Sequence, residues 1–232
     1  MTSETNASAP VIIVTGASGN LGGAVIARLL ATGARVVAVE RGRVRYGDDV
    51  LGPIDLGRAE LVQSAFAGVA ERLGGLDGVV HTVGVYQGGR SLLDTSSEDF
   101  TTLFQTNVVA TANVLRAALA LMLPQRRGQI AVVASADALA GAASRSAYSA
   151  SKGAQLRVVE SAAEEVRGRG ITVNAVLPGT MDTPQNRAAQ PTADRSSWLS
   201  LDSVAQVLAY LVSPSAAAIH GEAIRLGRSP AQ

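Results

Sequence analysis

The stretch VIIVTGASGNLGGAVIARLLATG, residues 11–33, decides the fold. It starts with an apolar run typical of a buried strand, and the residues after its glycine-rich turn have the apolar spacing of a helix that closes at Gly33. Glycines in such a turn permit close approach of a phosphate, and the helix behind them offers free amides and a positive dipole end. The stretch therefore predicts a dinucleotide site. The residues expected to contact the cofactor here are Gly16, Ser18, Asn20, Leu21 and Gly22.

The rest of the chain continues the alternation of strands and helices. Continuous apolar strands between helices are typical of a parallel sheet covered on both faces. Right-handed crossovers then give a single α/β domain, a doubly wound parallel sheet of about seven strands with helices on both faces. Strands are predicted at 35–40, 76–84, 128–135, 171–179 and 221–227, with a short one before Asp55, and helices near 58–73, 97–122, 146–168 and 201–213. This domain is assigned to residues 10–232, after a disordered polar tail at 1–9.

Composition excludes several classes of protein. The 232 residues carry a net charge of +1 and include two histidines and no cysteine. The lack of cysteine excludes disulfides and thiol catalysis, and with two histidines and no cysteine no metal site is expected. The balanced charge gives no footprint for nucleic acid or an anionic membrane. The N-terminal residues lack the features of a signal peptide, and no apolar run reaches the roughly 18 residues of a membrane span. We expect a cytoplasmic protein with a small-molecule substrate.

Charged residues at the end of the second strand bear on the choice of cofactor. Glu40 follows Gly16 by 24 residues, where a carboxylate accepts hydrogen bonds from both ribose hydroxyls and repels a 2′-phosphate. Arg41 could instead pair with that phosphate. NAD(H) is therefore favoured, with NADP(H) as the alternative. Asp55 and Leu56, after the short third strand, could border the adenine, and an ordinary loop carboxylate is an equally good interpretation of Asp55.

The stretch YSASK, residues 148–152, contains the only lysine in the chain. A coding bias toward arginine could leave one lysine anywhere, but this one follows a tyrosine by four residues. Positions four apart share a helix face, so Tyr148 and Lys152 can point into one site, where the cation favours the phenolate and lowers the tyrosine pKa. An ammonium is a compact point charge that a planar guanidinium cannot imitate. The stretch therefore predicts an activated tyrosine.

Five features together resemble the short-chain dehydrogenase/reductase family, over roughly residues 10–227. They are the glycine turn, Tyr148-x-x-x-Lys152, Ser135 thirteen residues before the tyrosine, Asn107 in LFQTNV, and PGTMDT after the sixth strand. The resemblance implies a Rossmann fold, a nicotinamide cofactor and a catalytic set of Asn107, Ser135, Tyr148 and Lys152. The further cofactor contacts expected at strand ends or from the resemblance are Gly84, Pro178, Gly179, Met181 and Thr183, besides Tyr148 and Lys152.

The resemblance and the chemistry give each member of the catalytic set a role. Hydride transfer to a carbonyl leaves an alkoxide, which Tyr148 would protonate as general acid. Lys152 would also hold the nicotinamide ribose, Ser135 would hydrogen-bond the substrate oxygen, and Asn107 would support a water relay behind the lysine. Ser135 could otherwise be a strand-end cap. Asparagine is a middling helix former, so Asn107 within a helix suggests a local bulge.

Three features depart from the family pattern. The glycines Gly16, Gly19 and Gly22 are three apart, where the common form has its later glycines at the positions of Asn20 and Gly22. HTVG at 81–84 replaces Asn-Asn-Ala-Gly, and we interpret His81 as a packed histidine rather than a second acid. The short segment between Glu40 and Asp55 predicts that the helix usually found there is lost.

The one long irregular segment expected is 180–200, a candidate substrate loop. LPGTMDTPQNRAAQPTADRSSW, residues 177–198, resembles the corresponding segment of quinonoid dihydropteridine reductases, which are NADH-dependent. That group works without a serine at the position of Ser135, so the intact set here suits a ketone or alcohol better than a quinonoid imine. The candidate substrate contacts are Asp182, Asn186, Arg187 and Trp198.

The predicted function is NAD(P)(H)-dependent oxidation or reduction of a small carbonyl, alcohol or pterin-like substrate. A 3-oxoacyl-thioester reductase acting on an acyl carrier protein is the alternative enzyme, and it would require NADPH, against which Glu40 argues. A dinucleotide sensor without turnover is the alternative outside enzymes, and it need not keep Tyr148 and Lys152. Apolar faces on the helices at 97–122 and 146–168 predict a homodimer or homotetramer, with packing inside one subunit as the other interpretation.

Overall fold

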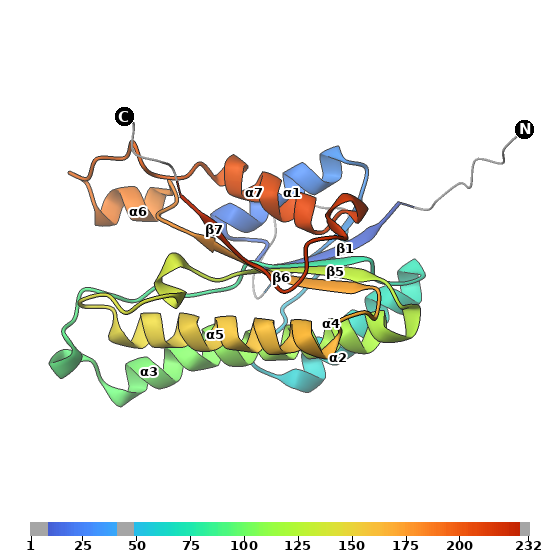
Figure 1. Cartoon of the computed structure of the whole chain (residues 1–232), viewed down its shortest axis with the longest axis horizontal. Coiled ribbons are helices and arrows are strands. Elements are labelled where there is room, and N and C mark those ends of the chain that lie inside the picture. Colours follow the sequence, from blue (N-terminus) through green and yellow to red (C-terminus); the bar gives the residue numbers. More distant parts are fainter. Residues whose placement is uncertain (1–8, 41–48, 228–232) are drawn as a thin grey trace, which may run out of the picture.

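The computed structural model describes residues 9–40 and 49–227, which form one α/β domain. Its seven strands make a single parallel sheet in the order β3-β2-β1-β4-β5-β6-β7, with helices on both faces (Figure 1). The predicted doubly wound sheet is confirmed, and β3 and β7 are its edges. The strands are β1 (Val11–Thr15), β2 (Arg35–Val39), β3 (Asp49–Leu51), β4 (Gly78–His81), β5 (Gly128–Val133), β6 (Ile171–Pro178) and β7 (Ala223–Leu226).

The helices form one layer on each side of the sheet. In Figure 1, α1, α6 and α7 lie above the sheet, and α2, α3, α4 and α5 lie below it. The helices are α1 (Asn20–Ala31), α2 (Ala59–Leu73), α3 (Ser97–Phe104), α4 (Ala110–Gln125), α5 (Ser146–Glu165), α6 (Pro184–Ala189) and α7 (Leu201–Leu211). Short 3-10 turns are η1 (Leu92–Asp94), η3 (Ala136–Ala138) and η4 (Pro214–Ala216), and η2 (Gln105–Val109) is a π-helix.

The core consists of two apolar layers, one on each face of the sheet. Successive side chains of a strand point to opposite faces of the sheet. Ile13 of β1 therefore packs in the layer between the sheet and α2, α4 and α5, while Ile12 and Val14 pack in the layer between the sheet and α1 and α7. All five residues of β1 are buried. This burial on both faces explains why the strands are continuous apolar runs rather than alternating ones.

Some element bounds differ from those predicted. The helix expected at 97–122 is α3, η2 and α4 in succession, extended to Gln125. The strand expected at 76–84 is shorter, so Gly84 lies in the loop after β4. The short third strand is confirmed as β3. The tail at 1–9 and the helix expected to be lost after Glu40 fall largely on 1–8 and 41–48, outside the described residues.

By length and composition alone, the helical stretch Ser97–Gln125 would suffice to cross a membrane, although the sequence contains no unbroken apolar run of that length. Half of its most apolar window is buried inside the molecule. Its second part, α4, packs against α2, α5 and the sheet. Packing in the core therefore explains the apolar character of the buried half of this helix.

Candidate active site

The candidate site lies at the carboxyl ends of β1 and β4, where the strand order reverses. Strands β2 and β3 extend the sheet from β1, and β5, β6 and β7 extend it from β4. Ligands of doubly wound sheets bind at this reversal. Thr15 at the end of β1 is paired with His81 at the end of β4, so the turns that leave both strands start next to each other. Gly16 and Val83, from those two turns, line the same cavity.

The turn after β1 requires glycine. Gly16 has φ +78°, in the left-handed region, and a Cβ on it would lie 2.6 Å from the hydroxyl oxygen of Thr82. A Cβ on Gly22 would lie 2.1 Å from the carbonyl oxygen of Gly16, so α1 packs directly on the turn. Within the described residues, no side chain caps the first turn of α1, which leaves its amides for an anionic group. Leu21 packs in the core, so only its backbone could contact a cofactor.

The carboxylate of Glu40 lies beside this turn. Its Oε2 accepts a hydrogen bond from the backbone N–H of Ser18 at 2.9 Å. A cavity of about 150 Å³ opens here, with apolar walls and a carboxylate, a combination that suits an adenosine with its ribose hydroxyls. Four predicted cofactor contacts line this cavity: Gly16, Glu40, Asp55 and Leu56. Arg41, the predicted partner of a 2′-phosphate, lies outside the described residues.

Asn107 lies in the π-helix η2, which confirms the bulge expected at this asparagine. Its Oδ1 accepts from the N–H of Val85 at 2.9 Å, and its Nδ2 donates to the Val85 carbonyl at 3.2 Å and to the Ser151 hydroxyl at 2.9 Å. The side chain therefore ties the loop after β4 to α5. Gly84 in that loop must be small, because a Cβ on it would lie 2.9 Å from Nζ of Lys152.

Tyr148, near the start of α5, lies close enough to Ser135, which follows β5, for that hydroxyl to influence its pKa. Ser135 also caps η3, since its hydroxyl accepts the N–H of Asp137 at 3.2 Å. The hydroxyl is therefore both a strand-end cap and a neighbour of the tyrosine. Burial raises the pKa of Tyr148, and the Ser135 hydroxyl opposes that effect. Tyr148 is thus protonated at neutral pH, the state that a general acid requires.

Lys152 lies one helical turn after Tyr148 and is only 3% exposed. Its Nζ donates to Oε1 of Gln155 at 2.9 Å and to the Val133 carbonyl at 3.4 Å. Burial lowers the pKa of Lys152 to about 7. The prediction that Lys152 lowers the pKa of Tyr148 is wrong for this arrangement, because the ammonium is bound to Gln155 and the burial of the phenol dominates.

Comparison with known proteins agrees with this geometry. A family model described as short chain dehydrogenase matches residues 10–194. The chain belongs to the short-chain dehydrogenase family. It is therefore an oxidoreductase of the nicotinamide-dependent kind.

Two relatives and one solved structure show how far the likeness extends. The chain is 28% identical to the 3-oxoacyl-(acyl-carrier-protein) reductase FabG of Vibrio cholerae, over 95% of this chain and 97% of the relative. It is 37% identical to the 2-(R)-hydroxypropyl-CoM dehydrogenase of Xanthobacter autotrophicus, over 78% and 79%. A structure of ElxO with NADP bound superposes with a TM-score of 0.86 at 21% identity, covering 94% of this chain and 96% of ElxO. That last likeness concerns the fold.

The sequence analysis predicted that segment 180–200 is irregular. In this short-chain dehydrogenase, part of the segment is helical. It contains α6, whose N-cap Thr183 accepts the N–H of Asn186 at 3.1 Å and whose first turn contains Pro184. A threonine cap followed by proline is a helix-start signal that the prediction overlooked. Met181 and Leu199 close the segment with an isolated parallel bridge.

The four candidate substrate contacts in this segment are all engaged within the segment itself. Asp182 forms a two-point ion pair with Arg187, at 2.5 and 2.7 Å, and Trp198 is buried. Asn186 donates to the Met181 carbonyl at 2.8 Å. These contacts show that the segment is a built structure.

Helix α6 connects the glycine turn to the segment that follows β6. Asn20 at the start of α1 donates to Oε1 of Gln185 in α6 at 2.7 Å, so α6 reaches the glycine turn. Pro178 is the last residue of β6, and the N–H of Gly179 donates to the Leu226 carbonyl at 3.0 Å. Helix α6 thus links the predicted cofactor contacts of the glycine turn after β1 to those at the end of β6.

Sequence reasoning missed an aromatic and charged cluster next to Tyr148. The ring of Tyr86 meets that of Tyr148 edge to face, with centroids 4.9 Å apart, and the guanidinium of Arg145 lies 5.8 Å from the Tyr86 ring. Arg145 is also paired with Asp137 at 3.0 Å. Arg145 precedes Tyr148 by three residues, so helix spacing was the signal available for it; Tyr86 is distant in sequence and had none.

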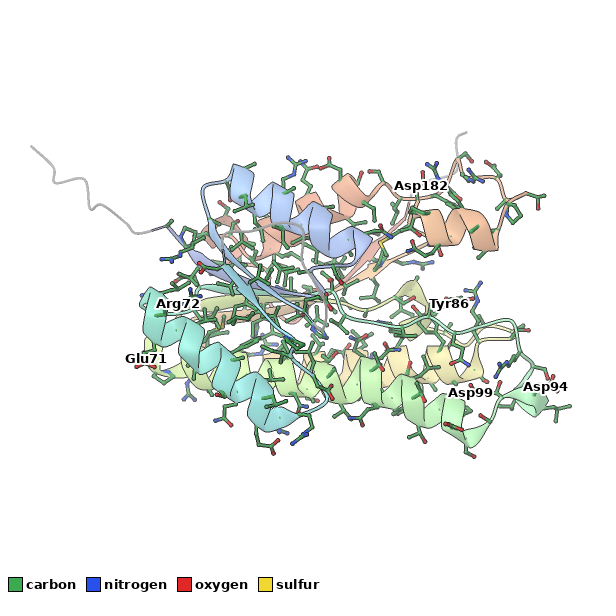
Figure 2. The ribbon with its side chains drawn as sticks, turned by 180° about the vertical axis from the view of Figure 1, so that it is seen from behind. Glu71, Arg72, Tyr86, Asp94, Asp99 and Asp182 are labelled. Atoms are coloured by element: carbon green, nitrogen blue, oxygen red, sulfur yellow. The ribbon has the colours of Figure 1, made fainter. Side chains whose placement is uncertain are left out.

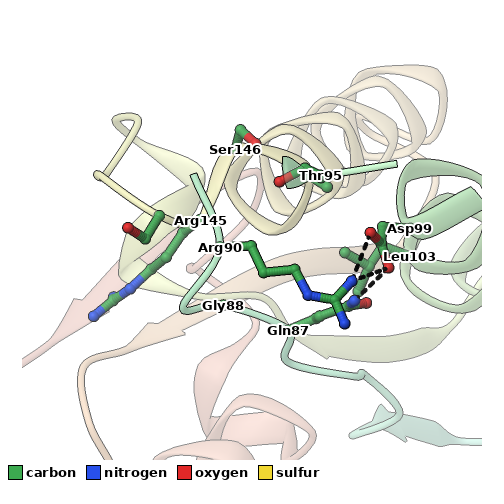
Figure 3. Close-up of a pocket in the computed structure, with 10 residues that line it drawn as sticks. Gln87, Gly88, Arg90, Thr95, Asp99, Leu103, Arg145 and Ser146 are labelled. Atoms are coloured by element: carbon green, nitrogen blue, oxygen red, sulfur yellow. Dashed lines mark hydrogen bonds and ion pairs between the residues drawn. The ribbon is translucent and has the colours of Figure 1, made fainter. Parts of the chain in front are cut away.

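The loop that carries Tyr86 is held in place by contacts with α3. Tyr86 and Asp182 lie at the same end of the molecule, opposite the end that carries Arg72 (Figure 2). Figure 3 shows a small pocket where Gln87 and Arg90 are both bonded to Asp99 of α3, at 2.5 and 3.0 Å. These bonds hold the loop after β4, which carries Tyr86.

His81 is fully buried, as its interpretation as a packed residue required. Its Nδ1 lies 2.7 Å from the Thr15 hydroxyl and its Nε2 lies 3.1 Å from the Thr111 hydroxyl. Burial, with a smaller contribution from the charge of Lys152, lowers the pKa of His81 to about 3. The imidazole is therefore neutral at physiological pH and is not an acid catalyst.

Proposed function

We propose that this protein is an NAD(H)-dependent dehydrogenase or reductase that interconverts a small secondary alcohol and its ketone. One observation carries the proposal: the buried Tyr148, whose raised pKa keeps its hydroxyl protonated, lies beside Ser135 and one helical turn before the buried Lys152. These three side chains lie at the carboxyl end of the sheet, where a doubly wound fold binds its ligands.

The residues would divide the chemistry as follows. A bound nicotinamide supplies or accepts the hydride. Ser135 would donate a hydrogen bond to the substrate oxygen, and Tyr148 would pass its proton to the alkoxide that forms there. The raised pKa of Tyr148 keeps that proton available in the reducing direction. Gly84 leaves room beside the ammonium of Lys152 for the cofactor's ribose.

The preference for NAD(H) rests on Glu40. Its carboxylate is already oriented by the Ser18 N–H in the cavity assigned to the adenosine, where it would meet both ribose hydroxyls and repel a 2′-phosphate. ElxO, with a similar fold, has been determined with NADP and with NADPH bound, which keeps NADP(H) as the alternative.

Three other substrates or roles stay open to the same test. FabG, similar over nearly its whole length, supports a 3-oxoacyl-thioester as the alternative substrate. A quinonoid dihydropterin is supported only by the resemblance of the segment at 177–198. A dinucleotide sensor would not need a protonated tyrosine beside Ser135 and one helical turn before a buried lysine, so this arrangement favours turnover.

The same proposal includes a homodimer or homotetramer assembled through α4 and α5. The groove between these two helices has a volume of about 610 Å³ and an apolar floor that includes Leu115, Leu119 and Leu123. Arg116, Arg157 and Arg169 line its sides with Glu165, so opposite charges are available for pairing across a two-fold axis.

Turnover of a substrate panel by Tyr148→Phe tests the function. We expect NADH fluorescence to show unchanged cofactor binding, while reduction of the substrate falls by about 10²–10⁴-fold because the proton donor is lost. The panel contains simple ketones, a 3-oxoacyl thioester and a quinonoid dihydropterin. The matched control is Tyr210→Phe, which changes an exposed tyrosine of α7. Cofactor binding without turnover of any panel member by the wild type would favour the sensor.

A further inference from the structure

The ammonium of Lys152 is buried, and it has no counter-ion among residues 9–40 and 49–227. No ion pair formed within the described residues includes it. A buried charge is strongly unfavourable unless it is paired or well hydrogen-bonded. Of its two protein acceptors, the Val133 carbonyl is at 3.4 Å and Oε1 of Gln155 is at 2.9 Å. Gln155 is therefore the stronger of the two.

Gln155 is in turn held by a chain of buried polar groups. Its Nε2 donates to the hydroxyl of Thr111 on α4 at 2.8 Å, and that hydroxyl donates to the Asn107 carbonyl at 2.7 Å. The Thr111 hydroxyl also contacts Nε2 of His81, whose Nδ1 contacts Thr15. Lys152 is thus connected to β4 and β1 through side chains that are all at most 3% exposed.

The contacts of the Thr111 hydroxyl decide which nitrogen of His81 carries the proton. The Thr111 hydroxyl has a single proton, which goes to the Asn107 carbonyl because a carbonyl can only accept. The hydroxyl must therefore accept from both Gln155 and His81, so His81 carries its proton on Nε2. Its Nδ1 is then an acceptor, and Thr15 donates to it. No member is left without a partner, which is the condition for a stable buried network.

The same reasoning fixes the amide of Gln155. Reversing the amide would turn its NH₂ group toward the ammonium of Lys152 and its oxygen toward Thr111, whose only proton is already used. Donor would then face donor, with the charge uncompensated. The network therefore holds an oxygen, and not an amino group, against Nζ of Lys152.

We infer that Gln155 is a positioning residue of the active site, which fixes the ammonium of Lys152 and favours its charged form, and that Thr111 and His81 hold Gln155 for this task. The inference rests on the proposed function, since Lys152 acts there beside Tyr148. The neighbouring helix positions Leu156 and Val159 are apolar and fully packed, so an apolar side chain at position 155 would suit the layer. A glutamine there requires the network and serves the lysine.

The titratable groups around Lys152 are few. His81 faces it from β4, and the charge of Lys152 contributes to the low pKa of that histidine. Tyr148 lies on the same helix and is itself influenced by Asp137, Tyr86 and Arg145. None of the groups whose charge acts on Tyr148 is hydrogen-bonded to Nζ of Lys152 in the described structure.

The single lysine makes a direct test possible. Protein labelled with ¹³C-lysine gives one lysine side-chain signal, and its ¹³Cε shift reports the protonation of Lys152 in cofactor-free enzyme. The wild type is expected to titrate near pH 7. Gln155→Met, similar in length, is expected to lower the proton-binding constant of Lys152 about tenfold, because a charge-assisted hydrogen bond is lost. Gln155→Glu, which keeps an acceptor, is expected to raise the constant by about tenfold or more.

The opposite signs separate positioning from mere packing. A packing defect would move both variants in the same direction, and that result, or titrations equal to the wild type, would overturn the inference. Thr111→Val, which leaves Gln155 in place but unsupported, is expected to act like Gln155→Met with a smaller change, and it decides the question if Gln155→Met does not fold. The alkaline limit of turnover is expected to follow the lysine titration. Shifted titrations in a protein without turnover would leave the positioning intact and refute only the proposed function.

Discussion

Replacing Lys152 by methionine is expected to stabilise the protein while abolishing its turnover. Burial lowers the pKa of Lys152 from 10.5 to about 7. That difference corresponds to about 5 kcal/mol by which the folded state disfavours the charged lysine. Methionine removes this cost but leaves Oε1 of Gln155 without its donor, which costs about 1–3 kcal/mol. The expected net gain near pH 6 is therefore on the order of 2–4 kcal/mol.

The gain should depend on pH in a defined way. Below pH 7 both folded and unfolded chains carry the charged lysine, so the cost is complete. Between about pH 7 and 10.5 the unfolded chain keeps the proton while the folded chain releases it, so the wild type becomes more stable as pH rises. At pH 9.5 only about 1.4 kcal/mol of the cost remains, and the wild type and Lys152→Met should be nearly equal in stability.

Urea unfolding at pH 6, 7, 8 and 9.5 measures this difference. At pH 6 the free energy of unfolding of Lys152→Met should exceed that of the wild type by about 2–4 kcal/mol, and thermal unfolding should give a melting temperature higher by roughly 4 °C or more. His81, whose pKa falls from an ordinary 6.5 to about 3 on folding, and Tyr148 are present in both proteins, so their contributions to the pH dependence cancel in the difference. Lys152→Arg is the control, because arginine stays charged and its cost persists at pH 9.5. Parallel stability curves for wild type and Lys152→Met would refute the reasoning.

Three further predictions concern the cofactor, the glycine turn and assembly. Glu40→Ser should weaken NADH binding about tenfold and tighten NADPH binding in nicotinamide fluorescence, and an unchanged ratio of the two Kd values would contradict the NAD assignment. Gly22→Ala places a Cβ 2.1 Å from a backbone oxygen and should cost about 1–3 kcal/mol or more and abolish cofactor binding. Gly68→Ala, with nothing within 4 Å, should instead gain about 0.5–1 kcal/mol in the same urea titration, and equal effects would refute the steric argument. Ala120→Arg adds a guanidinium to the groove between α4 and α5 and should lower the mass in light scattering; an unchanged mass would place the interface elsewhere.

What could be predicted from the sequence was set by local spacing and by topology. The glycine turn needs only Gly16 and Gly22 at the right separation, and parallel strands bring their carboxyl ends to one edge. Glu40 and Asp55 were therefore both candidate cofactor contacts, and both line the cavity beside the glycine turn. The bulge at Asn107 followed from the helix propensity of a single residue.

What could not be predicted depends on packing between distant segments. The orientation of the Lys152 ammonium is decided by Gln155 on its own helix and by Thr111 on α4, and no spacing rule indicates that these two side chains meet. The pKa of Tyr148 was predicted in the wrong direction for the same reason, since its burial depends on the tertiary structure. Helix α6 could have been predicted, because its threonine cap and Pro184 are helix-start signals. They were overlooked because the long segment around them was interpreted as an irregular loop.

The burial of the one lysine has a practical consequence. Apart from the terminal amino group, Lys152 is the only primary amine of the chain, and it is 3% exposed. Acylating reagents should therefore modify the native protein at the terminus alone, which permits oriented attachment to a surface. The slow acylation of Lys152 over hours would then measure how often the interior beside Tyr148 opens to solvent. This local opening could be followed without any introduced probe.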